Sequence, residues 1–496
     1  MKTGNPHLTI SEKPVPNLIR GRVVLIDPIP ARKDADITVR NSADFSTGSP
    51  VAVREPIAIE HIGAHLQKFG YDIKIIAQGS KTNEQLAQMA TDYAPQIVGL
   101  SMHSTYLCSH TLDLAARIKT QLGSTPIVVG GYHPSGYFDL ALDKNVDYIV
   151  IGEGEETMRQ VLDMVARCEN AKNVNGVAYL NGSEVMVNPP QPRLDFALLP
   201  WAMRDEEILR DSKCTPLAYP APPGQVSAAQ IAYSRGCPHL CGFCASPLIW
   251  GSKLSYREPK DVVDEILHLQ EKFGTNFLFF NDLSFNVNKE RANALCREMI
   301  KRVDGVSWFA YATIHGMDYE TARMMRDAGC TRLGFGIESV LDPTLAKIKP
   351  KQHFEDIERV LRMTSNLGML NRCYMLIGWP WESRETLDET AKRIKNLAMD
   401  QLRLSFVIPF PGTKFYEEQK HRIVVPFEEF SGDKPVMPSD HLNMEELKTA
   451  ATGLFSSFYG SGEYNAHVDE KVRQRPHLKN SFEYFFDYLK KHGIVS

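Results

Sequence analysis

The chain has 496 residues, of which 43% are hydrophobic and 23% are charged, and its formal net charge is −4. This length allows two or three domains with cores of their own, and the composition is that of a globular protein rather than a disordered one. A pI near 6.4 lacks the basic excess of a dedicated nucleic-acid-binding protein, so we expect a small-molecule substrate and no nucleic acid.

The sequence shows no signal for export or membrane insertion. Residues 1–20 mix Pro, Asn and Lys without an apolar core, which predicts an N-terminal arm and not a signal peptide. No later run has the length and apolar character of a transmembrane helix. The nine cysteines form no regular framework, which indicates a reducing compartment. We therefore predict a cytoplasmic protein without a membrane partner.

From residue 21 onward, short apolar runs alternate with stretches of helical periodicity. The strand-like runs lie at 22–28, 71–77, 96–102, 126–131 and 146–152. This alternation predicts a parallel sheet covered on both faces, so we expect a doubly wound, Rossmann-like α/β domain over residues 21–170. Sheets of this kind bind ligands at the carboxyl ends of their strands.

Three loops after these predicted strands carry small or polar residues. They are SMHS, GGYHPS and GEGEE, at 101–104, 130–135 and 152–156. Gly130 and Gly131 would let a bulky ligand approach the backbone, and Ser101 and Ser104 offer hydroxyl groups beside it. Taken alone, glycines after strands are more often simple turn residues.

Residues 171–225 have the pattern of a hairpin followed by a linker. Two short alternating runs flank Asn181 and Gly182, a dipeptide that favours a tight hairpin turn. A proline-rich segment at 220–225 follows. We place the boundary between two domains in this region.

Six further strand-like runs, separated by helical stretches, follow between residues 226 and 425. They lie at 231–236, 276–282, 307–314, 332–339, 371–379 and 401–410. Six βα units predict a partial barrel of the TIM type, with its chemistry at the carboxyl ends of the strands. Residues 426–496 are rich in aromatic residues at helical spacing, which predicts a small helical C-terminal cap.

The loop after the first of these strands carries the most specific motif in the chain. Cys237, Cys241 and Cys244 form a Cys-x3-Cys-x2-Cys run. An iron–sulfur cube takes four cysteine-type ligands. Three local thiolates therefore leave one iron open to a small molecule.

Two alternatives to a cluster remain at this point. Structural zinc normally uses four N or S ligands, and His239 in the same loop is a candidate for the fourth. The other alternative is a disulfide or redox pair, which a reducing compartment disfavours.

The cysteine run, with the aromatic Phe243 directly before its last cysteine, resembles the signature of the radical S-adenosylmethionine (SAM) enzymes. The resemblance implies a 4Fe–4S cluster whose open iron is chelated by SAM. It also implies that an electron from the reduced cluster cleaves SAM to methionine and a 5′-deoxyadenosyl radical. An external electron donor such as flavodoxin or ferredoxin is implied as a partner.

The resemblance extends to the ends of the other predicted strands. It implies a SAM site made by Phe243, Asp282, Glu338, Ser339, Ile377 and Gly378, with Glu338 near the ribose of SAM. Substrate contacts are proposed from position alone for His315, Tyr374, Trp379 and Trp381. The plainer interpretation of these last four is that the tryptophans pack beneath the cap and His315 is a loop residue.

The N-terminal domain resembles the cobalamin-binding domain of one radical SAM subfamily. This implies a cobalamin site at Ser101, Ser104, Gly130, Gly131, His133, Gly152 and Glu153. The chain lacks the Asp-x-His-x-x-Gly motif that places a histidine on cobalt in many cobalamin proteins. We therefore expect cobalamin without a protein histidine on the metal.

Together these resemblances imply a radical SAM enzyme that, with cobalamin, C-methylates an unactivated carbon of a small biosynthetic intermediate. One alternative keeps the radical initiation but ends in dehydration, deoxygenation, cyclisation or rearrangement, without bound cobalamin in some cases. A non-catalytic cobalamin or metal sensor is a second alternative, and the sequence devoted to holding SAM argues against it.

Overall fold

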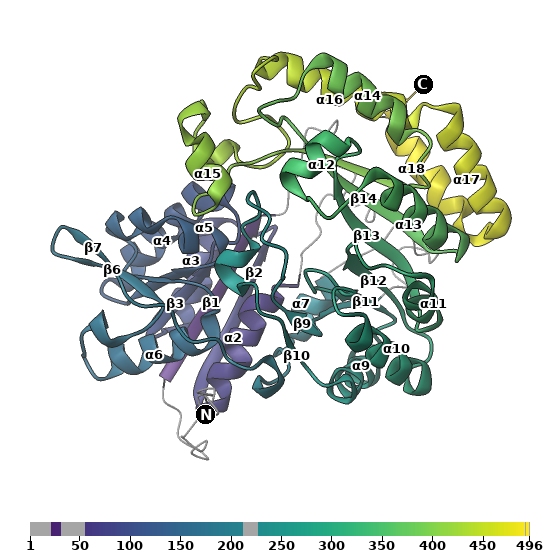
Figure 1. The fold of residues 1–496 in the computed structure, drawn as a ribbon. Helices are drawn as coiled ribbons and strands as arrows, with labels where there is room; N and C mark the ends of the chain where they lie inside the picture. The colour runs from purple at the N-terminus through teal and green to yellow at the C-terminus, as the bar shows by residue number, and fades with distance from the viewer. Residues whose placement is uncertain (1–20, 31–54, 212–226, 492, 496) are drawn as a thin grey trace, which may run out of the picture. The chain divides into compact units, whose positions relative to one another are not determined.

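The computed structural model describes residues 21–30, 55–211, 227–491 and 493–495. The predicted N-terminal arm and the proline-rich segment at 220–225 lie outside these ranges. The chain divides into two compact units, one made of residues 1–30 and 56–205 and the other of 31–55 and 206–496. Figure 1 shows both units, and each is described separately below. Of the helices in the described ranges, none combines the length and apolar character needed to cross a membrane.

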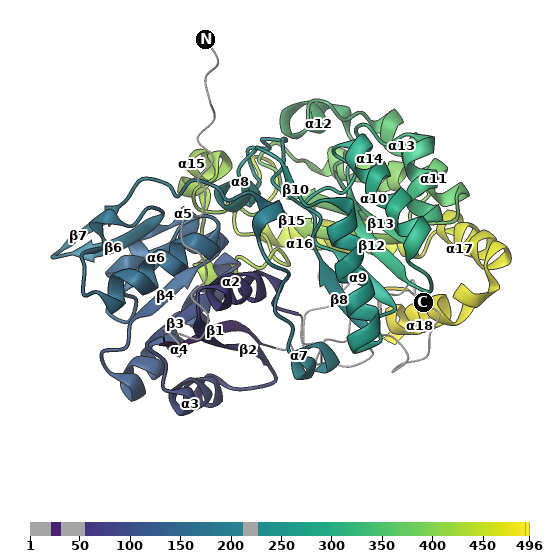
Figure 2. The ribbon, with the colours of Figure 1, turned by 90° about the horizontal axis from the view of Figure 1, so that it is seen from below.

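The first unit contains a seven-stranded sheet in the order β2-β1-β3-β4-β5-β6-β7, whose strands can be followed in Figure 2. Its strands are β1 (Gly21–Pro30), β2 (Tyr71–Gly79), β3 (Ile97–Ser101), β4 (Ile127–Gly130), β5 (Tyr148–Val150), β6 (Val177–Asn181) and β7 (Glu184–Val187). The first five are parallel, and the β6–β7 hairpin adds to the sheet antiparallel to β5. The hairpin that flanks Asn181 and Gly182 thus extends this sheet.

Helices cover both faces of the first sheet. They are α2 (Ile57–Lys68), α3 (Asn83–Tyr93), α4 (Cys108–Leu122), α5 (Tyr132–Gly136) and α6 (Gly154–Ala166). Val24 and Ile26 of β1 pack with α3 and α4, whereas Val23 and Leu25 pack with α2 and α6. Alternating β1 side chains thus point into two cores, which is why the strand reads as a continuous apolar run. The predicted doubly wound fold is confirmed, and its order reverses between β1 and β3.

The second unit contains a six-stranded parallel sheet whose strands follow one another in chain order, as in a TIM-type barrel. The strands are β8 (Ala228–Ile231), β11 (Phe277–Phe280), β12 (Ser307–Ala312), β13 (Cys330–Glu338), β14 (Leu370–Ile377) and β15 (Gln401–Phe406). A separate antiparallel pair, β9 (Ser234–Arg235) and β10 (Ser255–Tyr256), flanks the loop with the three cysteines. The predicted partial barrel is confirmed.

Helices cover the outer face of this partial barrel (Figure 1). They are α9 (Pro259–Phe273), α10 (Lys289–Arg302), α11 (Tyr319–Asp327), α12 (Asp342–Ile348), α13 (Phe354–Asn366) and α14 (Arg384–Ile394), with the short α7 (Glu206–Asp211), α8 (Ser246–Trp250) and α15 (Lys414–Gln419) between strands and at the edges. Helix α9 begins at a proline and ends at Gly274, whose φ of 64° makes a left-handed cap. Ser383 caps α14, and its hydroxyl accepts from the amide of Thr386.

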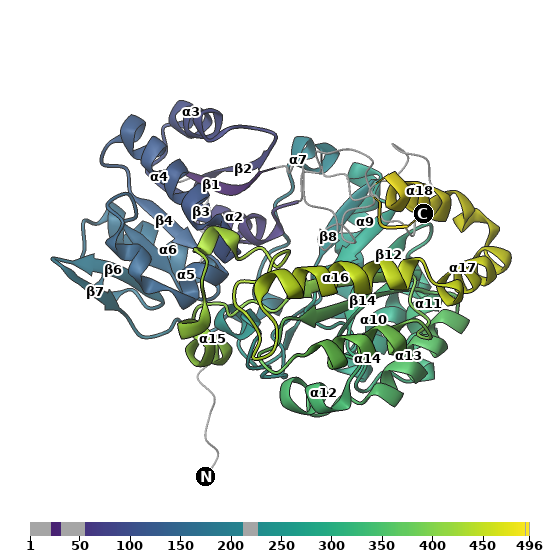
Figure 3. The same cartoon turned by 90° about the horizontal axis from the view of Figure 1, so that it is seen from above.

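The C-terminal segment forms three helices, α16 (Met444–Tyr459), α17 (Gly462–Gln474) and α18 (Lys479–Lys491), which run along one side of the second unit in Figure 3. Four of their aromatic residues are buried, as the helical spacing predicts; Phe455, Phe458, Tyr459 and Phe485 are each 1% exposed. The Tyr459 hydroxyl accepts from the Leu402 amide at 2.9 Å, and the Tyr464 hydroxyl donates to the Asp400 carbonyl at 2.9 Å. These contacts place α16 and α17 against the amino end of β15, opposite to the end that leads to catalytic loops in such barrels.

Candidate active site

The loop with the three cysteines lies after β8 and β9, on the carboxyl side of the barrel. Gly236 opens it with a φ of 97°, and a Cβ added there would collide with the carbonyl of Lys253, so only glycine fits. Within the loop, the Cys244 amide donates to the carbonyl of Cys241 at 3.0 Å, and the Cys237 amide donates to the carbonyl of Gly251 at 3.3 Å. The backbone therefore fixes the curl that the cysteine spacing predicts.

Asp282 anchors the start of this loop from below. Its carboxylate is fully buried and accepts from the amides of Tyr233 and Ser234, at 3.1 and 2.6 Å, and from the Ser234 hydroxyl at 2.5 Å. Burial outweighs these bonds and raises the pKa of Asp282 to about 6. The resemblance implied that Asp282 contacts SAM, but the geometry favours a positioning role, because both carboxylate oxygens already hold the strand that leads into the cysteines.

The thiols of the three cysteines are partly buried. Burial raises the pKa values of Cys237 and Cys241, the latter to about 11, and each of the two thiols senses the charge of Cys244. Among the described residues, no three His, Cys, Asp or Glu side chains are close enough to hold one metal ion. In an iron–sulfur cube each cysteine binds a different iron, so its ligands lie further apart than those of one zinc ion. His239 remains in the same loop, and burial lowers its pKa.

Glu338, at the end of β13, has an unusual backbone. Its φ is 59°, in the left-handed region that a non-glycine residue rarely adopts, and the register with β14 shifts between Gly336 and Glu338. The strand carbonyls released by this irregularity find side-chain donors. Lys349 donates to the carbonyl of Gly336 at 2.6 Å, and Gln352 donates to that of Ile337 at 2.8 Å.

The same lysine pairs with the predicted ribose contact. The ammonium group of Lys349 lies 3.4 Å from the carboxylate of Glu338, and its charge lowers the pKa values of Cys237 and Cys241 against the larger effect of burial. Glu338, Lys349 and the cysteines therefore share one neighbourhood. The predicted contact Ser339 is 7% exposed, and its hydroxyl accepts from the Leu341 amide at 3.2 Å within its own turn.

Aromatic rings pack together between the end of β14 and the cysteine loop. Phe243 meets Trp379 edge to face at 5.4 Å, and Trp379 stacks on Trp381 at 5.4 Å with an interplanar angle of 11°. Gly378 has a φ of 84°, whereas the side chain of Ile377 is 1% exposed within the helix-facing core. The structure thus brings Phe243 and Gly378 together with the two tryptophans, and leaves only the backbone of Ile377 available to a ligand.

Glu382 holds this turn from behind. Its carboxylate is 7% exposed and accepts from the amides of Gly378 and Trp379. Burial raises its pKa to about 7. The predicted site did not include Glu382, Lys349 or Gln352, since a lone Glu or Lys in a loop has no local pattern that marks it as a support for a strand end.

The four predicted substrate contacts lie in different surroundings. Tyr374 faces Tyr311 at 5.7 Å, and the guanidinium of Arg372 lies 5.2 Å from its ring centre. His315 is exposed after β12. Trp379 is 1% exposed and belongs to an apolar cluster, which agrees with the packing interpretation, and Trp381 donates to the Thr344 hydroxyl at 3.2 Å.

In the first unit, the predicted cobalamin residues meet at the carboxyl edge of the sheet. Ser101 ends β3 and Gly130 ends β4, where the Met102 amide donates to the carbonyl of Gly130 at 2.7 Å. Gly131 has a φ of 122°, and a Cβ there would lie 2.5 Å from the carbonyl oxygen of Met102. Gly152 has a φ of 79° and its amide donates to the Ser135 hydroxyl at 3.1 Å. At Gly131 the missing side chain makes room for the backbone of Met102, so this glycine is required by the turn itself, and the cobalamin contacts at this edge stay a prediction.

The remaining predicted cobalamin residues are engaged within the first unit or stand beside this edge. His133 is 2% exposed and stacks on Tyr137 at 5.3 Å, and burial lowers its pKa to about 4, so its ring is neutral at pH 7. Glu153 accepts from Arg193 at 3.0 Å. Ser104 precedes a short 3₁₀ turn and is half-buried.

Comparison with known proteins assigns both units. Residues 231–394 match the model of the radical SAM superfamily, and residues 48–162 match the model of the B12 binding domain. The first match covers the cysteine loop and strands β11 to β14 of the partial barrel, and the second covers strands β2 to β5 of the doubly wound sheet.

Similar proteins and a similar solved structure are consistent with these two domain matches. The chain is 25% identical over 416 residues to an uncharacterised methyltransferase of Pyrococcus horikoshii, covering 82% of this chain and 87% of that protein. It is 25% identical over 473 residues to the anaerobic magnesium-protoporphyrin IX monomethyl ester cyclase of Rubrivivax gelatinosus, covering 90% and 83%. The fold resembles that of the radical SAM methyltransferase TsrM from Kitasatospora setae, with a TM-score of 0.69, 17% identity and 89% of each chain covered.

Proposed function

The chain belongs to the cobalamin-binding radical SAM enzymes, and we propose that it C-methylates an unactivated carbon of a small-molecule biosynthetic intermediate. The observation that carries this proposal is the presence of both cofactor-binding domains in one chain. When bound, the 4Fe–4S cluster supplies the electron that cleaves SAM to a 5′-deoxyadenosyl radical, and cobalamin supplies the methyl group. Relatives named as methyltransferases add support.

The chain's own residues position and shield the reactants. Cys237, Cys241 and Cys244 supply the thiolates, and Asp282 fixes the strand from which their loop leaves. Lys349 and Gln352 fix the end of β13, so that Glu338 is held where the resemblance puts the ribose of SAM. Phe243 and Trp379 form an apolar wall that excludes water, which a primary carbon radical requires.

Methyl-labelled SAM tests the proposal. The protein is reconstituted anaerobically with iron, sulfide and hydroxocobalamin, reduced, and incubated with labelled SAM and a small-molecule extract as the source of acceptor. We expect label in a small-molecule product, together with 5′-deoxyadenosine. Activity in a preparation that excludes cobalamin would contradict the proposal.

The cyclase relatives favour a second candidate function, because one of them matches 90% of this chain. In this case the radical is generated in the same way, but the substrate is dehydrated, deoxygenated, cyclised or rearranged without receiving a methyl group. The labelling experiment separates the two candidates. Formation of 5′-deoxyadenosine with an altered but unlabelled product supports the second.

An external reductant follows from either candidate, because each needs an electron for the cluster. We propose a flavodoxin- or ferredoxin-type donor as that partner. Replacing chemical reductant with reduced flavodoxin should sustain formation of 5′-deoxyadenosine, and failure with both protein donors would count against this assignment.

A further inference from the structure

Three arginines face the interior of the partial barrel. Side chains on a strand alternate between its two faces. Residues of β13 to β15 that pack in the helix-facing core are Leu333, Phe335, Cys373, Met375, Leu402 and Leu404. Arg332, Arg372 and Arg403 occupy the alternate positions, and the strand register places each one row higher than the one before. The inner face therefore carries a ladder of cations that rises from the amino end toward the carboxyl end.

Arg332, the lowest of the three, is buried without an acidic partner among the described residues. It is 5% exposed, and its guanidinium lies 5.9 Å from the ring centre of Phe309. Its guanidinium forms no hydrogen bond or ion pair with any residue that the structure describes. Burial and the neighbouring Arg372 lower its pKa to about 9. A buried cation without a paired anion is costly, and such groups gather at binding sites.

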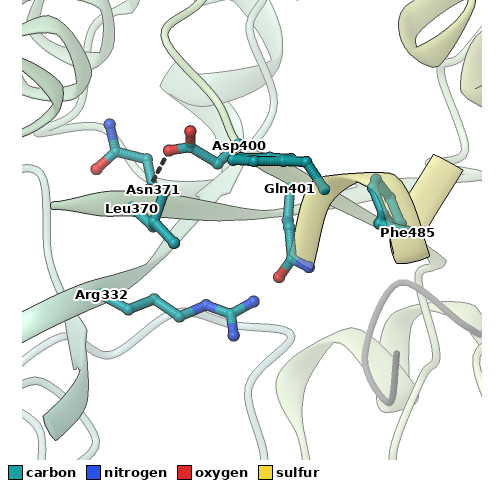
Figure 4. Close-up of a pocket in the computed structure, with 7 residues that line it drawn as sticks. Arg332, Leu370, Asn371, Asp400, Gln401 and Phe485 are labelled. Carbon is teal, nitrogen blue, oxygen red and sulfur yellow. Dashed lines mark hydrogen bonds between the residues drawn. The ribbon is translucent and has the colours of Figure 1, made fainter. Parts of the chain in front are cut away.

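The one carboxylate that lines the same cavity is already engaged. Asp400 accepts from the Asn371 amide at 2.7 Å and lies 3.0 Å from a ring nitrogen of His467. Figure 4 shows the Asp400 carboxylate beside Asn371, while the guanidinium of Arg332 extends into the space below β14. Asp400 therefore does not neutralise Arg332 directly.

Gln401 supplies a second polar group that lacks a partner. It is 5% exposed, and its Oε1 has no hydrogen-bond partner among the described residues. Its amide extends toward the same space as the guanidinium of Arg332 (Figure 4). Leu370, Phe482 and Phe485 form apolar walls around the two groups. A polar pair in an apolar pocket is the arrangement that recognises one small charged group.

The chemistry of the pocket selects the ligand. A guanidinium presents a planar fork of donors that matches a carboxylate, and the pocket is too small for more than a terminal group. Arg332 and Glu338 are six residues apart on one strand, which is about 20 Å. A ligand that reaches from the floor to the carboxyl edge is therefore long, and it passes the rings of Tyr311 and Tyr374, which stand on the inner face.

We propose that Arg332 and Gln401 bind the terminal carboxylate of an elongated, largely apolar substrate at the amino-end floor of the barrel. The inference rests on the proposed function, since it assigns a class of substrate to the same enzyme.

Thermal unfolding of the anaerobically reconstituted holoenzyme tests this site with simple carboxylates. Sodium hexanoate and sodium acetate are compared with sodium chloride at equal ionic strength. We expect a rise in Tm with both carboxylates, larger with hexanoate because its chain lies along the apolar interior. Arg332→Met should abolish the rise while leaving the Tm without carboxylate equal to or above that of the wild type, because a buried unpaired charge is gone. Arg359→Met, at an exposed helix position, is the matched control.

Three results would overturn the proposal. They are a carboxylate effect that persists in Arg332→Met, a wild-type enzyme indifferent to both carboxylates, and stabilisation by acetate but not hexanoate, which describes a site for small free anions. If Arg332→Met does not fold, Gln401→Leu carries the same test, with at least a threefold weaker response to hexanoate expected. Formation of 5′-deoxyadenosine without substrate is measured in parallel. Its absence in the wild type would refute the proposed function while leaving the carboxylate result intact.

Discussion

The two ends of the barrel strands each contain a fully buried aspartate, and the two are held in opposite ways. Asp282, at the carboxyl end, accepts only from neutral donors, namely two amides and a hydroxyl. Asp400, at the amino end, faces the cations of Lys471 and, when protonated, His467, at 3.9 and 3.0 Å. Burial therefore raises the pKa of Asp282 to about 6, whereas its partners hold the pKa of Asp400 below its usual range.

This difference indicates that the carboxyl end of the strands serves the chemistry, whereas the amino end serves stability. At the carboxyl end, unfavourable free energy is stored close to the cysteines. Its sources are the buried carboxyl groups of Asp282 and Glu382, whose pKa values are raised, and the positive φ of Glu338. At the amino end, α17 supplies the charges and donors that satisfy the strand termini. Arg332 is the exception at this end, because its buried guanidinium has no partner among the described residues.

The largest expected effect is at the carboxyl end. Cys237→Ala should abolish cluster assembly, because two thiolates from the loop cannot hold the cube. We expect iron and sulfide near zero after anaerobic reconstitution and no formation of 5′-deoxyadenosine. Cys168→Ser is the control, since this cysteine is exposed and lies in the first unit. Stoichiometric zinc without sulfide in the wild type would overturn the cluster assignment.

At the amino end, the expected effect is on stability and not on chemistry. Asp400→Asn removes the charge that Lys471 and His467 face, and we expect a loss of about 3–5 kcal/mol in the free energy of unfolding, as for other broken buried pairs. The affinity for SAM should change less than about twofold where the variant is folded. Denaturant unfolding and SAM titration measure the two quantities, with exposed Asp388→Asn as the control. A large loss of SAM affinity in a stable variant would contradict the division between the two ends.

The pH dependence of stability distinguishes the two aspartates. Asp282 has a folded pKa of about 6, above its usual value of 3.8, so its contribution is fully present below about pH 4 and is lost as the pH rises through 6. This shift corresponds to about 3 kcal/mol. Asp400 has a lowered pKa, so its contribution is present above its unfolded pKa and is lost as the pH falls through its folded pKa. Asp282→Asn should therefore flatten the decline between pH 4 and 6, and an unchanged slope would refute the assignment.

The sequence predicted the two folds well, because period-two and helical patterns repeat over many residues in both units. It also located the cysteine loop, because the three cysteines lie within eight residues of one another. The SAM contact of Asp282 stays a prediction, because a polar residue at a strand end has the same pattern whether it faces a ligand or the backbone of the next loop.

No local sequence pattern predicts which residues support the strand ends. The hydrogen bond from Lys349 to the carbonyl of Gly336 depends on a register shift in β13, and no turn residue in the sequence predicts that shift. The partners of Asp400 come from a helix about 70 residues further along the chain. Such pairs form only when the tertiary fold brings them together.

The smallest expected effect concerns Glu338, the residue that links the strained strand end to SAM. Glu338→Ala removes the carboxylate that Lys349 holds at 3.4 Å, and with it one hydrogen-bond acceptor for the ribose. Loss of one charged hydrogen bond of about 1.5 kcal/mol weakens binding roughly tenfold. A SAM titration of the reconstituted enzyme measures the change, with exposed Glu355→Ala on α13 as the matched control. Because alanine also tolerates a positive φ poorly, Glu338→Gln separates the two causes: it keeps the chain length and should recover part of the affinity if the contact, rather than the backbone, carries the effect. Equal SAM affinity in the wild type and in Glu338→Ala would leave the strand end without the role that its geometry suggests.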